Sequence, residues 1–167
     1  MDINVASVKN YEGKAVPIDC EITIPGDPED DFRIVSPVRL KGELRNFGGT
    51  LELDLKGEAE LVLVCDRCAE EYERTVEFGI EERFKEQGAS DEDTENPDVI
   101  YFSGDAIGLD EHVYSNLVVS LPGKHLCGED CKGICAECGK NLNNGSCDCS
   151  RDVTDPRFDI LDSLNLD

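Results

Sequence analysis

Eight of the nine cysteines in this chain of 167 residues fall into two groups. One group is the pair Cys65-Asp-Arg-Cys68. The other is a run of six in the C-terminal part: Cys127, Cys131, Cys135, Cys138, Cys147 and Cys149. Two thiolates separated by a short turn can both face one ion, and sets of four thiolates are typical of structural zinc sites. The spacing therefore predicts that zinc organises the C-terminal part of the protein.

The simplest grouping of these cysteines gives two sites. Cys135, Cys138, Cys147 and Cys149 are close enough in sequence to form one compact site without help from elsewhere. Cys65 and Cys68 then form a second site with Cys127 and Cys131, which would fasten the tail to the rest of the chain. Another pairing exchanges Cys127 or Cys131 with Cys147 or Cys149. We therefore expect one or two zinc ions.

Other chemistry for these residues has to be weighed against a structural zinc. Four thiolates also suit iron, although nothing else in the sequence indicates electron transfer. His125 is a possible substitute ligand, but a solvent-exposed loop histidine is the simpler interpretation. Arg67 would favour a reactive thiolate at Cys65 or Cys68. A redox dithiol usually follows a strand and opens a helix, however, and the residues on both sides of this pair are typical of strands.

The sequence before the tail is typical of β-structure. Apolar residues alternate with polar ones at Ile18, Cys20, Ile22 and Ile24, which predicts a strand in which Cys20 is a small buried apolar residue. Further strands are expected over residues 38–45 and 51–55, joined by a turn at 46–49. Two more should enter Cys65 through residues 61–64 and leave Cys68 through residues 72–80, so that the cysteine pair forms a knuckle at one end of a sheet.

The remaining elements complete a two-part organisation. Residues 85–97 are acidic and are expected to form a mobile loop, followed by a short strand near residues 99–101. Residues 109–121 have helical spacing of apolar side chains, with His112 at the surface of the first turn. A short terminal helix is expected from Asp155. The predicted fold class is α+β: an antiparallel β-sheet or barrel-like domain with one main helix over residues 1–122, and a small zinc-stapled module over residues 123–167.

The formal net charge of −22 limits the possible partners. Such a chain repels phosphate backbones at long range, so a basic protein partner is favoured over wide-area nucleic-acid binding. Arg39, Lys41 and Arg45 form the main basic stripe and are a possible phosphate contact. We expect them instead to meet Glu52 and Asp54 across the hairpin. The sequence contains no membrane-spanning stretch, export signal or catalytic motif, which favours a cytoplasmic protein that is not an enzyme.

Several motifs together resemble the YceD family, in its branch with a cysteine-rich tail. They are Val64-Cys65-Asp-Arg-Cys68, Ser120-Leu121-Pro122, the run 126–143, Cys147-Asp-Cys149 and Asp155-Pro156-Arg157-Phe158. The resemblance implies a role in accumulation of 23S ribosomal RNA and hence in assembly of the large ribosomal subunit. It implies no catalytic residues.

Charge and resemblance together predict a zinc-binding assembly factor. It would contact the large-subunit precursor mainly through a basic ribosomal protein, with direct rRNA contact left open. The alternative is a thiol redox enzyme or a zinc-delivery protein that uses Cys65 and Cys68.

Overall fold

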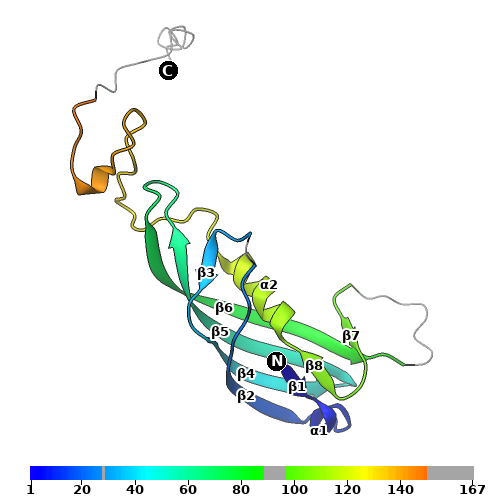
Figure 1. Ribbon diagram of the computed structural model, residues 1–167. Helices are drawn as coiled ribbons and strands as arrows, with labels where there is room; N and C mark the ends of the chain where they lie inside the picture. The colour runs from blue at the N-terminus through cyan, green and yellow to red at the C-terminus, as the bar shows by residue number, and fades with distance from the viewer. Residues whose placement is uncertain (28, 89–96, 150–167) are drawn as a thin grey trace, which may run out of the picture.

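Two long strands form the centre of an open sheet in the computed structural model, which describes residues 1–27, 29–88 and 97–149 (Figure 1). The elements in chain order are β1 (Asp2–Asn4), α1 (Ala6–Lys9), β2 (Ala15–Ile22), β3 (Phe32–Ile34), β4 (Val38–Phe47), β5 (Thr50–Val64), β6 (Glu71–Glu86), β7 (Ile100–Phe102), β8 (Ala106–Gly108), α2 (Asp110–Ser120) and the 3-10 turn η1 (Leu142–Asn144).

The larger sheet has the strand order β2-β4-β5-β6-β7, with β3 paired to the far end of β5. All of these pairs are antiparallel except β6 with β7. The path does not close on itself, so the domain is an open sheet and not a barrel. The long hairpin of β5 and β6 runs in unbroken register from Thr50 opposite Lys85 to Val64 opposite Glu71, which carries Cys65 and Cys68 beyond one end of the sheet.

One face of the sheet is apolar because each strand alternates buried and exposed residues. On β5 this face holds Leu51, Leu53, Leu55, Leu61 and Leu63, each almost fully buried. α2 packs on it through Val113 and Leu117, which are also fully buried. The alternation and the helix confirm the predicted α+β class. The same burial leaves the opposite face of the sheet to charged residues.

The hairpin of β4 and β5 turns at two glycines with positive φ, Gly48 at 60° and Gly49 at 82°. Side chains on L-residues are strained in this region, so the Asn-Phe-Gly-Gly sequence suits a tight turn here. Asn46 is buried beside the turn and donates from its amide to the carbonyls of Val8 and Lys9, each at 2.9 Å. α1 is thereby held against the hairpin.

Several elements differ in detail from the sequence-based expectations. β6 continues to Glu86, into the segment expected to be a loop, and residues 89–96 lie outside the described residues, as does the helix expected from Asp155. Cys20 packs against the core but is only half-buried. His112 is not a surface residue: its ring meets the ring of Phe84 edge to face, at a centroid distance of 5.2 Å. The pattern missed the short elements β1, α1, β3 and β8 because each has too few residues to show a period.

The described helices include none that is both long enough and apolar enough to cross a bilayer. The division at residues 122 and 123 stays a prediction.

Candidate metal centre

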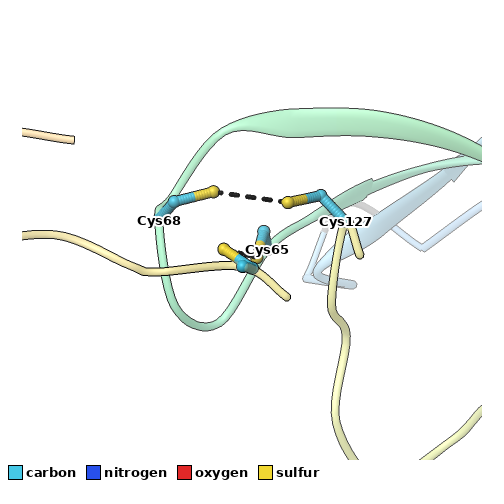
Figure 2. A group of neighbouring side chains, drawn as sticks. Cys65, Cys68 and Cys127 are labelled. Carbon is cyan, nitrogen blue, oxygen red and sulfur yellow. Dashed lines mark hydrogen bonds between the residues drawn. The ribbon is translucent and has the colours of Figure 1, made fainter. Parts of the chain in front are cut away.

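The end of the β5–β6 hairpin is a knuckle that carries Cys65 and Cys68. The N–H of Cys65 donates to the carbonyl of Glu70 at 2.9 Å, and the N–H of Ala69 donates to the carbonyl of Cys65 at 2.8 Å. Ala69 has a φ of 57°. The tight turn directs both sulfurs toward the same side, where Cys127 approaches from the tail (Figure 2).

The first cluster consists of Cys65, Cys68, Cys127 and Cys131, whose Sγ atoms all lie within 4.8 Å of one another. The Sγ atoms of Cys65 and Cys131 are 3.8 Å apart, and those of Cys68 and Cys127 are 3.7 Å apart (Figure 2). A regular tetrahedron with Zn–S bonds of about 2.3 Å places its sulfurs about 3.8 Å apart. The spacing of the four thiols therefore fits a tetrahedral metal ion.

The first cluster is largely shielded from water. Cys65, Cys68 and Cys131 are buried, while Cys127 is exposed. The partly buried side chains of Tyr72 and Leu126 pack against the cluster. This burial suits a structural site, in which protein ligands fill every coordination position.

The second cluster consists of Cys135, Cys138, Cys147 and Cys149, and again all Sγ atoms lie within 4.8 Å of one another. Its knuckle repeats the backbone hydrogen bonds of the first. The N–H of Cys135 donates to the carbonyl of Lys140, and the N–H of Gly139 donates to the carbonyl of Cys135, both at 2.9 Å. Gly139, with a φ of 70°, occupies the place that Ala69 has in the first knuckle. The two turns thus present their thiols in the same way.

Arg67, at the tip of the first knuckle, contacts the tail on both sides. Its Nη1 donates to the carbonyls of Glu129 at 3.2 Å and Cys131 at 3.0 Å, and its own carbonyl accepts from the N–H of Ile134 at 2.9 Å. Gly133 lies so close that a Cβ there would stand 2.9 Å from this carbonyl oxygen. The side chain that suggested redox chemistry in the sequence therefore holds the tail against the knuckle.

His125 is buried, which makes the expectation of an exposed loop histidine wrong. Its N–H donates to Oδ2 of Asp66 at 2.7 Å, and its carbonyl accepts from the N–H of Asp66 at 2.8 Å. Its ring nitrogen Nδ1 lies 3.6 Å from a carboxylate oxygen of Asp31. The backbone pairing with Asp66 brings Cys127 to the cluster, while four thiols surround the centre without the imidazole.

Two asparagines brace the first cluster, and the sequence analysis had treated this region only as a turn. Asn143, in η1, donates from Nδ2 to Sγ of Cys131 at 3.3 Å and accepts from the N–H of Lys132 at 2.8 Å. Asn141 donates to Oε1 of Glu70 at 3.2 Å. The segment between the two halves of the second cluster therefore supports the first cluster. Only the asparagine-rich composition hinted at this role.

The thiols within each cluster differ in acidity. At Cys65, burial opposes ionisation, but backbone hydrogen bonds from Cys127, Cys68 and Arg67 outweigh it and lower the pKa to about 6. At Cys135, backbone hydrogen bonds from Cys138 and Glu137 lower the pKa to about 6. Neighbouring thiols raise the pKa of Cys127 and of Cys149 to about 12. Each cluster thus retains protons unless a cation compensates the charge of four thiolates.

The basic stripe on β4 is paired with carboxylates, though not with the predicted ones. Arg39 contacts Glu21 and Glu58, each at 3.2 Å, and Lys41 lies 4.0 Å from Asp19. Arg45 pairs with Glu43 on its own strand. Glu52 pairs with Arg83 of β6. Neighbouring carboxylates therefore flank every member of the stripe.

The chain is similar to proteins whose family is described as large ribosomal RNA subunit accumulation protein YceD. The family model matches residues 53–165, more than half of the chain. An uncharacterized protein of Mycobacterium tuberculosis is 32% identical over 64% of this chain and 59% of its own length. The chain thus spans about three-fifths of the length of that relative.

Two further relatives match other portions. An uncharacterized protein of Bacillus subtilis, YlbN, is 27% identical over 80% of this chain and 77% of its own length. A chloroplastic YCED homolog of Arabidopsis thaliana is 33% identical over 35% of this chain and 18% of its own length. No solved structure matches the chain.

Proposed function

Because the chain belongs to the YceD family, we propose that it is a non-enzymatic factor that supports 23S rRNA accumulation and assembly of the large ribosomal subunit. The family match over residues 53–165 is the observation that carries this proposal. The family is named for accumulation of large-subunit RNA and not for a reaction. We further propose that the protein works in the cytoplasm, where its thiols remain reduced.

Zinc is the metal we propose for both clusters. Cys65, Cys68, Cys127 and Cys131 would hold one ion, and Cys135, Cys138, Cys147 and Cys149 the other. Sulfur separations of 3.7 and 3.8 Å in the first cluster support a tetrahedral ion. Bound zinc would compensate the thiolate charge and fix the tail on the sheet. Iron is the less favoured occupant.

The partner we propose is a basic protein of the large-subunit precursor. A formal net charge of −22 supports attraction to a basic protein and opposes extended contact with rRNA phosphates. The pairing of Arg39, Lys41 and Arg45 with carboxylates also reduces their availability for phosphate.

Affinity purification of the tagged, zinc-loaded protein tests the proposed function. We expect large-subunit precursors to copurify, and we expect 23S rRNA to be lost from the complex when ribosomal proteins are removed first. Failure to recover any precursor would contradict the assembly role. Tight binding to protein-free 23S rRNA at physiological salt would contradict the protein partner.

A metal count separates this proposal from the alternative of a redox or zinc-delivery protein. We expect two zinc ions per chain by native mass spectrometry, one after Cys68→Ser or Cys138→Ser, and two after the control Cys20→Ser. The knuckle at Cys65 and Cys68 joins two strands and lies at no helix N-terminus, which disfavours redox chemistry. Free and reactive thiols at this pair in the purified protein would favour the alternative.

A further inference from the structure

One edge of the large sheet has no strand partner along most of its length. β6 extends from Glu71 to Glu86, but β7 pairs only with Phe84 to Glu86. Between residues 71 and 83, the outer edge of β6 meets no other strand of the described part of the chain. This stretch is on the order of 40 Å long, at about 3.3 Å per residue. It is long enough to accept an extended segment of another polypeptide.

The register shows which backbone groups face outward from this edge. Cys65 exchanges a hydrogen bond with Glu70, and hydrogen-bonded pairs recur at every second residue of an antiparallel ladder. Since the register of β5 and β6 has no bulge, the N–H and C=O groups of Glu73, Thr75 and Glu77 point away from β5. The N–H of Gln87 has the same parity and reaches the carbonyl of Phe102 beside β7. The geometry beyond Thr75 is therefore that of an unfilled ladder.

Side chains along the same edge are predominantly acidic. Glu71, Glu73, Glu77 and Glu81 are exposed and alternate with residues of the apolar face. Glu71 is paired with Arg33, whereas the other three have no ion pair within the described residues. Thr75 and Gly79 leave space between the carboxylates, and nothing lies within 4 Å of the Cβ position at Gly79. A strand lying here would place every second side chain among carboxylates.

The opposite edge of the sheet lacks these properties. β2 is eight residues long and contains Pro17, which has no N–H to donate. Proline on an edge strand is a common way to prevent pairing with another chain. β6 contains no proline and is twice as long. Its charges hinder pairing with a second acidic copy but attract a basic segment.

We propose that the outer edge of β6 from Glu71 to Glu81 binds an extended basic segment of a protein partner by strand addition. The inference rests on the proposed function, because it gives the basic partner a location on the molecule. Backbone hydrogen bonds to Glu73, Thr75 and Glu77 supply the geometry. Lysine or arginine at alternate positions meets the carboxylates of Glu73, Glu77 and Glu81.

A synthetic peptide of alternating lysine and valine, about nine residues long, tests the edge directly. We expect titration of the zinc-loaded protein to give a dissociation constant on the order of 10 µM at low salt, which weakens as salt is added. Hydrogen exchange measured by NMR should slow at the N–H groups of Glu73, Thr75 and Glu77. Binding without this protection, or no binding, would overturn the inference.

Matched variants separate strand addition from simple charge attraction. Thr75→Pro removes one outward N–H and should weaken peptide binding about tenfold, while Thr75→Val keeps the N–H and should bind as the wild type does. Zinc content and the thermal transition check that both variants fold. A peptide N-methylated at alternate residues provides the same test without altering the protein, and it too should bind about tenfold more weakly.

Charge is tested by a triple change to glutamine at Glu73, Glu77 and Glu81. We expect about a tenfold loss of affinity. The control is the same change at Glu12, Glu29 and Glu111, which are exposed elsewhere, and it should retain most of the affinity. Equal losses in the two triple variants would mean that only net charge matters and would contradict a site on β6.

The two proposals can fail separately. If the wild type copurifies with precursors and Thr75→Pro does so equally well, the edge is not the docking site and the assembly role stands. If the peptide binds with protection of the Thr75 amide but no precursor is recovered, the edge site stands and the proposed function falls.

Discussion

Ala69 occupies a backbone conformation that its counterpart in the second knuckle fills with glycine. Its φ of 57° is the only positive value at a non-glycine residue in the described ranges. A Cβ in this region costs about 1 kcal/mol, which glycine avoids. The first knuckle therefore keeps its fold against a local strain that Gly139 spares the second.

Exchange at these two positions should have opposite effects. We expect Ala69→Gly to raise the free energy of unfolding of the zinc-loaded protein by about 0.5–1 kcal/mol, and Gly139→Ala to weaken the second knuckle by about 1 kcal/mol. Urea titration measures the first effect, and the rate of zinc transfer to a chromophoric chelator measures both. Gly128→Ala is the control, since no atom lies within 4 Å of its Cβ position and its φ is not positive. A faster zinc loss from Ala69→Gly would contradict the strain.

Acidity at Cys65 and Cys135 predicts the direction of the pH dependence. Both pKa values are lowered from 9.0 to about 6, so the stabilisation from these thiolates is complete above pH 9 and is lost as the pH falls to 6. Bound zinc competes with protons and moves the loss to lower pH. We expect both ions to be retained at pH 7 and released below about pH 5, as followed by native mass spectrometry. Retention of both ions well below that pH would contradict thiolate ligation.

At the scale of elements, β4 and β5 approach each other unusually closely at Gly42. A Cβ at this position would lie 2.0 Å from the carbonyl oxygen of Asp54, which belongs to the backbone and cannot move aside alone. Gly42 is opposite Leu55 in the ladder, and both neighbouring strands carry core residues. The local curvature of the sheet thus depends on a residue without a side chain.

Gly42→Ala should therefore destabilise the sheet by about 3 kcal/mol, because the two strands must separate or slip. Chemical denaturation followed by circular dichroism measures the change. Gly79→Ala, on β6, is the matched control. Its Cβ would meet nothing within 4 Å, so we expect a change below about 1 kcal/mol. Similar losses in both variants would show that glycine acts here through chain entropy alone.

At the scale of the whole molecule, the sheet and the tail are stabilised by different means. The main core contains only residues of the sheet, α1, α2 and the segments that join them. The described tail buries few apolar side chains beyond its cysteines, among them Leu142. Burial alone therefore cannot hold the tail, and the metal clusters supply what the core lacks.

Removal of zinc with a strong chelator should release the tail and leave the sheet folded. We expect fast exchange of the N–H groups of Ile134 and Leu142, which are bonded to the carbonyls of Arg67 and Gly133. The amides of β5 should remain protected, because they lie between β4 and β6. Hydrogen exchange before and after chelation measures both, and re-addition of zinc is the control. Loss of protection in β5 at the same chelator concentration would contradict the separation.

The sequence by itself determined the features that depend on neighbouring residues. Alternation over residues 18–24, 38–45 and 51–55 predicted β2, β4 and β5, helical spacing predicted α2, and cysteine spacing singled out the eight thiols that lie in two groups of four. Their role as metal ligands stays a prediction. These signals are readable because strand, helix and knuckle each impose a local period or spacing.

Only the tertiary structure decided which distant residues meet. It placed Asn143 on the sulfur of Cys131, buried His125 beside Asp31, and gave Arg39 its partners Glu21 and Glu58 on the strands to either side of β4. It also left the outer edge of β6 without a strand partner among the described residues. A side-chain period specifies which face a residue occupies, but strand order, register and the path of the tail specify its neighbours, and these depend on contacts between segments far apart in the chain.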